Sequence, residues 1–141
     1  MIQTLSTIVS NEQIAQDSWR IAFTAPQIAS EIKPGQFVHV KITQRNDFLL
    51  RRPFSVSRLV NMDKGNIGLE VVYKVVGRGT RFMTLLRPGD ELDIIGPLGH
   101  GFELNKTKKA HILLAGGIGA ACLFMLGEVI SEAVDKDNLE L

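Results

Sequence analysis

Short β-prone runs separated by turn-forming residues fill the first two thirds of the chain, and this pattern limits the folds open to it. Turn-forming sequences, Lys33-Pro34-Gly35 and Arg87-Pro88-Gly89-Asp90, stand before two of the runs. Such a series of short strands predicts an antiparallel barrel, because closure leaves no exposed strand edge. The six runs expected to be strands are residues 5–9, 18–24, 36–42, 54–59, 69–76 and 91–95. Residues 80–86 predict one short helix between two strands, with Thr80 as its N-cap.

A different pattern begins at Lys106. Residues 110–115 are almost uniformly apolar, which is typical of a parallel strand buried on both faces. A glycine-rich turn follows, and residues 120–134 are rich in helix formers, so the segment predicts the first half of a βαβ unit. We therefore expect a barrel over residues 1–105 and, over residues 106–141, the first strand and helix of a truncated α/β nucleotide-binding domain.

Composition excludes several classes of function. The formal net charge of +1 gives no basic excess for binding a nucleic acid backbone. A single cysteine, Cys122, excludes an internal disulfide, an all-cysteine zinc site and a cysteine-ligated iron–sulfur cluster within this chain, and no metal site is expected. The uncharged stretch at 112–127 is shorter than the roughly 20 residues that span a bilayer, so no membrane segment is expected. The first residues lack the pattern of an export signal, and a cytoplasmic location is expected.

The sequence Arg52-Pro53-Phe54-Ser55 combines groups that suit a phosphorylated aromatic ligand. The arginine offers a fixed positive fork for phosphate oxygens, the phenylalanine a flat apolar face, and the serine a small hydroxyl. Pro53 fixes the local backbone angle. Taken alone, the tetrapeptide is more typical of an ordinary strand start with a surface arginine and a core phenylalanine.

Gly77-Arg78-Gly79-Thr80 lies between a predicted strand and the predicted short helix. Glycines let the backbone approach a ligand closely, and the first turn of a helix offers N–H groups to an anion. A plain glycine-rich turn is the alternative interpretation.

Gly116-Gly117-Ile118-Gly119 follows the apolar segment and precedes the predicted helix, which is the setting of a dinucleotide pyrophosphate loop. The spacing matches only part of that fingerprint, because Cys122 stands where a third glycine would be expected. A further phrase, residues 96–102, fits either a bare connector or a rigid loop lining a flat ligand.

Together and in this order, these phrases resemble the ferredoxin-reductase flavoprotein superfamily, and within it the electron-transfer subunits of dihydroorotate dehydrogenase B. The similarity covers nearly the whole chain. The motifs that carry it are residues 50–57, 72–74, 77–80, 96–102 and 114–119. The resemblance implies a mainly β fold, namely a six-stranded antiparallel Greek-key barrel that binds FAD and carries one short helix, followed by a nucleotide domain. Phe54 stands where many members of the superfamily have tyrosine, which keeps the aromatic face and loses a hydroxyl.

The resemblance also implies roles for individual residues. Arg52 would hold the FAD diphosphate, with Pro53 fixing the backbone, and Phe54 would lie against flavin or ribose. Ser55, the one residue expected to take part in catalysis, would hydrogen-bond near the reactive flavin nitrogen. Backbone N–H groups of the glycine-rich turn would meet the diphosphate. The remaining implied positions are Val72, Tyr73 and Lys74 beside the adenine or ribitol, Gly79 and Thr80 at the FAD diphosphate, and Gly116, Gly117 and Gly119 at the NAD diphosphate.

In that family, FAD passes electrons between NAD and a [2Fe–2S] cluster that connects to an FMN-containing dihydroorotate dehydrogenase catalytic subunit, in a heterotetramer serving pyrimidine synthesis. The cluster's cysteine ligands lie near the carboxyl end in the family and are not in this chain, so the chain alone is expected to be an incomplete enzyme component. Two alternatives stay open: the reductase component of a sulfide- or hydrogen-linked system, and a barrel binding module or truncated barrel without activity.

Overall fold

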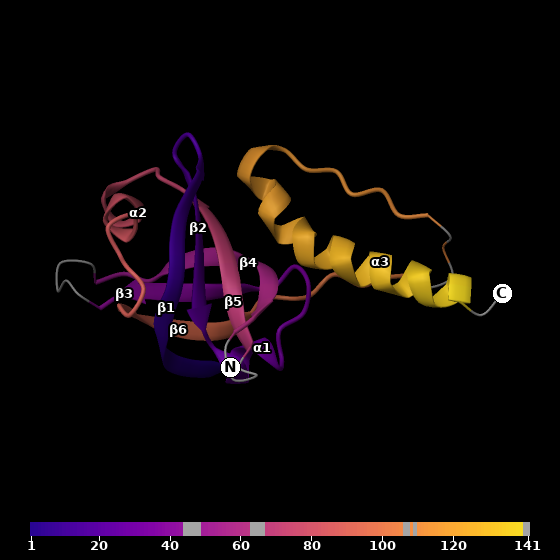
Figure 1. Cartoon of the computed structure of the whole chain (residues 1–141), viewed down its shortest axis with the longest axis horizontal. Helices are drawn as coiled ribbons and strands as arrows, with labels where there is room; N and C mark the ends of the chain where they lie inside the picture. Colours follow the sequence, from indigo (N-terminus) through magenta and orange to yellow (C-terminus); the bar gives the residue numbers. More distant parts are fainter. Residues whose placement is uncertain (44–48, 63–66, 106–107, 109, 140–141) are drawn as a thin grey trace.

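Six antiparallel strands form a closed barrel in the order β1-β2-β5-β4-β3-β6 (Figure 1). The computed structural model describes residues 1–43, 49–62, 67–105, 108 and 110–139. Strand β6 returns to lie beside β3, next to the consecutive strands β3, β4 and β5, which is the Greek-key connection. The predicted six-stranded antiparallel Greek-key barrel is therefore confirmed. The strands are β1 (Ile2–Ala15), β2 (Ser18–Thr24), β3 (Phe37–Ile42), β4 (Arg52–Asn61), β5 (Ile67–Lys74) and β6 (Glu91–Leu98).

Alternation along the strands fills the barrel interior. Val38, Val40 and Ile42 of β3 are almost completely buried, whereas the residues between them are half-buried on the outer face. The turns before β3 and β6 form as predicted, with Gly35 and Gly89 at positive φ. Strand β1 is longer than predicted, because its first half pairs with β6 and its second half with β2.

Two short helices cover opposite ends of the barrel. Helix α1 (Pro26–Ala29) follows the end of β2, and α2 (Arg78–Met83) follows the end of β5. The two ends are opposite because Thr24, at the end of β2, pairs with Gly68, near the start of β5. Helix α1 was not predicted, since it is a single turn begun by Pro26.

Helix α2 begins earlier than predicted, and its N-cap is Gly77 rather than Thr80. Thr80 is the third helical residue. Its hydroxyl accepts hydrogen bonds from the N–H groups of Val76 and Gly77, at 3.0 and 3.1 Å. The threonine therefore stabilises the helix start from inside the first turn, as the third residue of a capping box does.

Strands β4 and β5 diverge at one end. Their ladder begins at the pair Val56 and Val71. Before it, β4 pairs with β3 from Arg52 to Ser55; beyond it, β5 pairs with β2 as far as Lys74. In the described part of the chain the two strands thus form a fork, defined by β4 residues 52–55 on one side and β5 residues 72–74 on the other.

The strand predicted at residues 110–115 is not formed: the described residues there have no ladder partner, and the Ile112 and Leu114 side chains are 93% and 91% exposed. A parallel strand needs neighbouring strands to complete its hydrogen bonds, and this segment has none among the described residues. The 3₁₀ helix η2 (Gly117–Leu123) and α3 (Phe124–Leu139) follow, in place of one helix over residues 120–134. Residues 106, 107, 109, 140 and 141 of the predicted second unit lie outside the described residues.

Helix α3 lies beside the barrel and extends away from it (Figure 1). Its first turns and η2 pack on β4 through the buried side chains of Ala121, Met125 and Leu126. Among the described residues, no helix has the length and apolar character needed to cross a membrane.

Candidate functional site

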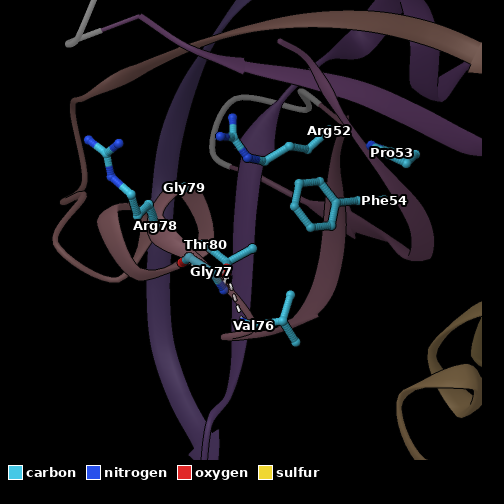
Figure 2. A pocket seen from close by; sticks show the side chains of 8 residues that line it. All are labelled: Arg52, Pro53, Phe54, Val76, Gly77, Arg78, Gly79 and Thr80. Atoms are coloured by element: carbon cyan, nitrogen blue, oxygen red, sulfur yellow. Dashed lines mark hydrogen bonds between the residues drawn. The ribbon is translucent and has the colours of Figure 1, made fainter. Parts of the chain in front are cut away.

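A cavity of about 610 Å³ opens at the fork between β4 and β5 (Figure 2). One wall consists of Arg52, Pro53 and Phe54, at the start of β4. The other wall is the turn of residues 76–80, which joins β5 to α2. Two motifs that are far apart in the sequence therefore line one cavity, whose volume falls within the range of small-molecule sites.

Gly79 brings the two walls into contact. A Cβ atom added at this position would overlap the Arg52 guanidinium. Glycine is needed here because the guanidinium packs directly against the backbone of the turn. A hydrogen bond within its own segment also fixes Arg52, because its Nη1 donates to the carbonyl oxygen of Leu50 at 3.1 Å.

The charge of the cavity is of one sign. Of the described residues, eight line it; these include two arginines, Arg52 and Arg78, and no aspartate or glutamate. The apolar part of the lining comes from Pro53, Phe54 and Val76. The cavity thus suits a ligand that joins an anionic group to a flat apolar one, which is the chemistry of a phosphorylated aromatic molecule.

Phe54 is supported from within the barrel by Tyr73. The two rings meet edge to face, with centroids 6.0 Å apart and an interplanar angle of 62°. Tyr73 is 1% exposed, and its hydroxyl donates to Oδ1 of Asn11 at 3.2 Å. Burial raises the pKa of the Tyr73 phenol above its usual value, although the hydrogen bond with Asn11 acts in the opposite direction.

Asn11, which the sequence analysis did not single out, connects this support to α2. Its Nδ2 donates to the carbonyl oxygens of Met83 and Leu86, at 2.7 and 2.9 Å. These bonds satisfy one carbonyl group at the end of α2 and one in the turn that follows it. Asn11 therefore links β1, Tyr73 and the helix that follows the cavity turn, a role that depends on long-range contacts and has no local sequence signal.

The cavity brings together five of the residues predicted for the site, and the others lie elsewhere. Ser55 is half-buried on β4, opposite Phe37 of β3, and does not line the cavity. Val72 is half-buried and Lys74 exposed on β5, outside the cavity lining, as is the buried Tyr73. The five residues in the cavity are Arg52, Pro53, Phe54, Gly79 and Thr80.

The three glycines of the predicted pyrophosphate loop are in open surroundings. A Cβ added at Gly116, Gly117 or Gly119 would meet nothing within 4 Å. Residues 96–102, for which two interpretations were open, do not line the cavity. That segment packs on the turn before β3, where Gln36 Nε2 donates to the Gly99 carbonyl and the Phe102 N–H to the Pro34 carbonyl, both at 2.8 Å.

Three lining residues were missed as site residues: Val76, Gly77 and Arg78. Two of them belong to the glycine-rich phrase, in which only Gly79 and Thr80 had been assigned a role. The signal was thus present in the sequence for Gly77 and Arg78. Val76 ends an apolar run, and only the observed 79% exposure of its side chain separates it from a core residue.

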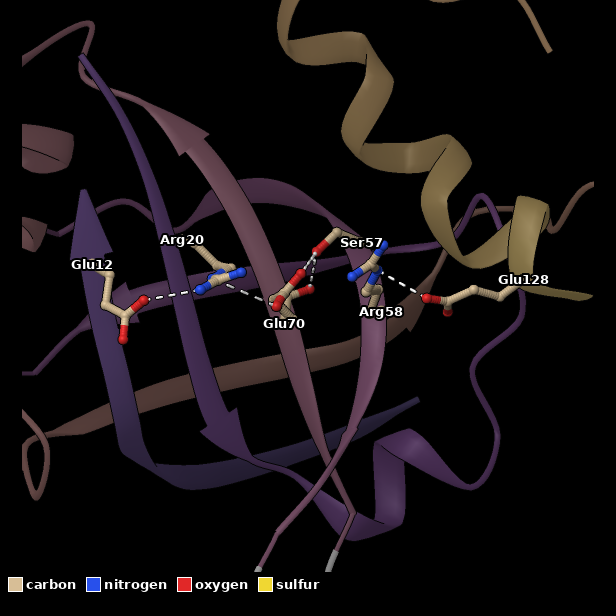
Figure 3. Close-up of polar contacts among 6 residues, drawn as sticks. All are labelled: Glu12, Arg20, Ser57, Arg58, Glu70 and Glu128. Atoms are coloured by element: carbon tan, nitrogen blue, oxygen red, sulfur yellow. Dashed lines mark hydrogen bonds and ion pairs between the residues drawn. The ribbon is translucent and has the colours of Figure 1, made fainter. Parts of the chain in front are cut away.

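Beyond the fork, a row of polar contacts crosses the outer face of the sheet toward α3 (Figure 3). A register shift on β4 between Val56 and Arg58 leaves Ser57 buried, and its hydroxyl bonds to the Glu70 carbonyl and carboxylate at 3.0 and 2.9 Å. Arg58 then points to α3, where its Nε lies 2.9 Å from Glu128 Oε1. Its guanidinium carbon is 5.3 Å from the centroid of the Phe124 ring. The strand that carries one cavity wall is therefore also the strand that contacts α3.

Comparison with known families gives one match across most of the barrel. The family described as "Oxidoreductase FAD-binding domain" matches residues 6–102. This range contains both walls of the cavity.

Two curated relatives carry the same description, "Dihydroorotate dehydrogenase B (NAD(+)), electron transfer subunit". The protein from Shouchella clausii is 36% identical over 128 residues, which cover 89% of this chain and 48% of the relative. The protein from Desulforamulus reducens is 43% identical over 113 residues, which cover 80% of this chain and 42% of the relative. The chain thus spans about half the length of the curated relatives it matches.

Two solved structures share the fold at moderate sequence identity. One is an NADH-dependent reduced ferredoxin-NADP oxidoreductase, with a TM-score of 0.74 and 28% identity, covering 92% of this chain and 45% of that one. The other is phthalate dioxygenase reductase, described as a modular structure for electron transfer from pyridine nucleotides to [2Fe–2S]. Its TM-score is 0.67 at 27% identity, covering 89% of this chain and 38% of that one.

Proposed function

The chain belongs to the oxidoreductase FAD-binding domain family, and from this premise we propose that it holds FAD in the cavity between Arg52 and the turn of residues 76–80. The observation that carries the proposal is the meeting of the two motifs in one cavity with two cations and an aromatic ring. The fit is further supported at Gly79, where a side chain would fill the space that the Arg52 guanidinium occupies.

We assign the residues of the cavity as follows. Arg52 binds the diphosphate through its guanidinium fork, and the N–H groups of Gly79 and Thr80 bind it from the other wall. Phe54 offers its ring to the flavin or ribose, in an orientation maintained by Tyr73. Pro53 keeps Arg52 and Phe54 at a fixed spacing.

Other positions on the two strands of the fork complete the assignment. Ser55 follows Phe54 directly, and we assign its hydroxyl to a hydrogen bond near the reactive flavin nitrogen. Val72 and Lys74 flank the adenine or ribitol side. Tyr73 acts there through its backbone and through Phe54, because its side chain is buried.

When bound, FAD supplies the ability to exchange a hydride with a nicotinamide and single electrons with an iron–sulfur centre. The chain contributes binding, orientation and shielding from water: two cations for the phosphates, and apolar groups from Pro53, Phe54 and Val76 beside the ring system.

We further propose that the whole protein is an electron-transfer subunit of dihydroorotate dehydrogenase type. It would pass electrons between NAD and an FMN-containing catalytic subunit in a heterotetramer, in pyrimidine synthesis. The names of the relatives support this. Its [2Fe–2S] cluster would need cysteines from outside this chain, which contains one. A cytoplasmic location, where NAD is a common redox carrier, is part of the proposal.

In the same proposal, residues 106–141 are the start of the NAD-binding domain, and Gly116, Gly117 and Gly119 meet the NAD diphosphate. The setting of these glycines, after an apolar segment and at the start of η2 and α3, supports the assignment.

A reductase that serves another partner is the second candidate. The likeness to phthalate dioxygenase reductase and to a ferredoxin-NADP oxidoreductase, at 27% and 28% identity, supports this second candidate. Co-purification of the whole protein with an FMN-containing subunit supports the first candidate, and co-purification with a flavin-free partner supports the second. A colourless barrel that takes up no flavin would contradict both.

The direct test is to purify the chain, record its flavin spectrum and stoichiometry, and repeat this with Arg52→Ala and Thr80→Val. We expect one FAD per chain. Arg52→Ala should weaken binding about 10- to 100-fold, the effect of losing a charge-assisted hydrogen bond of roughly 1.5–3 kcal/mol. Thr80→Val should have a smaller effect, because the backbone donors remain and the lost hydroxyl bonds lie within the turn. Unchanged affinity in Arg52→Ala would refute the proposed site.

A further inference from the structure

The cavity lining includes two arginines, and the proposed function assigns a role to only one of them. Among its eight lining residues, Arg52 has a role in the proposed function and Arg78 has none. We propose that Arg78 is a second phosphate-binding residue, and that it makes the site selective for a flavin dinucleotide over a flavin mononucleotide. This inference rests on the proposed function, because it assumes a flavin nucleotide in this cavity.

The two arginines reach the same turn from different elements. Arg78 is the first residue of α2 and is exposed at the cavity edge, between Gly77 and Gly79. Arg52 comes from β4, and its guanidinium packs on Gly79, the residue directly after Arg78. Gly79 therefore has Arg78 as its neighbour in the sequence and the Arg52 guanidinium as its neighbour in the folded structure.

The order of the lining residues matches the order of the groups in a flavin dinucleotide. In Figure 2, Phe54, Arg52, Gly79 and Arg78 follow one another across the cavity. A flavin nucleotide whose ring system lies at Phe54 would place its first phosphate at Arg52. Only a ligand that continues past that phosphate would bring a second one to Arg78.

This order gives the two ligands different partners. FMN ends at its single phosphate and, of the two arginines, would use only Arg52. FAD carries a second phosphate and an adenosine, so it would use both guanidinium groups, each suited to two parallel hydrogen bonds with phosphate oxygens. Arg78 therefore contributes to the affinity for FAD and not to the affinity for FMN.

Arg81 provides a matched control. It is an exposed arginine on the same helix, one turn further on, and it is not among the residues that line the cavity. A general electrostatic attraction of α2 for nucleotides would depend on Arg78 and Arg81 alike. A specific contact would depend on Arg78 only.

The test measures the dissociation constants of FAD and FMN by titration calorimetry at fixed ionic strength. It uses the whole chain as wild type, Arg78→Ala, Arg78→Lys and Arg81→Ala, with thermal melting of each apo variant to confirm folding. We expect Arg78→Ala to weaken FAD about tenfold and to leave FMN within about twofold, so that the preference for FAD falls about tenfold. Arg78→Lys should restore part of the FAD affinity, because charge returns without the planar fork. Arg81→Ala should change neither constant by more than about twofold.

Equal losses for FAD and FMN in Arg78→Ala, or equal losses of FAD affinity in Arg78→Ala and Arg81→Ala, would overturn the inference. If Arg78→Ala does not fold, Arg78→Gln replaces it with the same expectations. The proposed function fails separately: it is refuted if wild type binds no flavin or if Arg52→Ala binds FAD as wild type does. Wild-type binding that Arg52→Ala weakens and Arg78→Ala leaves unchanged would refute only the role of Arg78.

Discussion

Individual residues determine whether the two cavity walls can meet. The chemistry of Arg52 and of the glycine-rich phrase was predictable, because guanidinium groups and flexible backbone are recognisable from residue type alone. The position of Tyr73 was not. Neighbouring residues of a strand face opposite sides, and only the barrel shows that the Tyr73 ring lies inside it, behind Phe54.

We predict that Gly79→Ala weakens flavin binding by about tenfold or more, because the added methyl displaces the Arg52 guanidinium from the turn. Gly77→Ala is the matched control. Gly77 has extended backbone with φ of −169°, which any residue adopts, and an added Cβ there meets nothing within 4 Å. Flavin titration of both variants tests the prediction, and equal effects of the two would contradict it.

A strand could be predicted where the alternation of its own residues is enough to specify it. The alternation at residues 37–42 and the turns around it specify β3 without knowledge of its neighbours. Residues 110–115 differ, because a parallel strand exists only when adjacent strands complete its hydrogen bonds. The fork was likewise outside the reach of sequence analysis, since it depends on which residues of β4 and β5 pair across the barrel.

An ion pair fixes the start of β4 to β6, and its effect should depend on pH. Arg51, directly before β4, donates to the carboxylate and to the backbone carbonyl of Asp93, and Gln3 donates to the same carboxylate. Partial burial alone would raise the pKa of the Asp93 carboxyl, but the hydrogen bonds from Arg51 and Gln3 outweigh it and hold this pKa below its usual value. A lowered folded-state pKa stabilises the fold above the unfolded-state pKa of about 3.9, and this stabilisation is lost as the pH falls through the folded-state value.

We therefore predict that Asp93→Asn lowers the free energy of unfolding by about 1–2 kcal/mol at pH 7, and that its difference from wild type shrinks as the pH falls below about 4. Urea unfolding at pH 7 and at pH 3 measures both values. Glu31→Gln, at an exposed acid, is the control and should change stability little at either pH. A difference for Asp93→Asn of the same size at both pH values would show that the effect is not electrostatic.

At the scale of the whole molecule, β4 joins the cavity to the carboxyl-terminal helix. The same strand carries Arg52 and Phe54 at one end and Arg58, in contact with Glu128 and Phe124 of α3, further along. Buried apolar side chains of η2 and α3 supply most of this attachment, because an exposed ion pair and an exposed cation–π contact contribute only about 0–1 kcal/mol each.

We predict that Arg58→Ala speeds amide hydrogen exchange at the start of α3 about fivefold and leaves the thermal melting of the barrel nearly unchanged. Arg20→Ala is the control: it removes another arginine of the polar row, which pairs with Glu12 and Glu70 and not with α3. Exchange that rises equally in both variants would contradict a local role of Arg58. Detachment of the whole helix in Arg58→Ala would contradict the statement that buried apolar side chains supply most of the attachment of α3.

The fork between β4 and β5 has a consequence for how the protein responds to losing its ligand. Among the described residues, Arg52–Ser55 of β4 form no ladder pairs with β5. The barrel wall therefore lacks, at this one place, the backbone hydrogen bonds that join its other neighbouring strands. A nucleotide bound there would contact both β4 and the turn after β5 through its phosphates, and so would connect the two strands where they do not pair. Without the nucleotide the two strands would be freer to move apart at the fork, so the ligand-bound protein would be the more rigid form of the barrel.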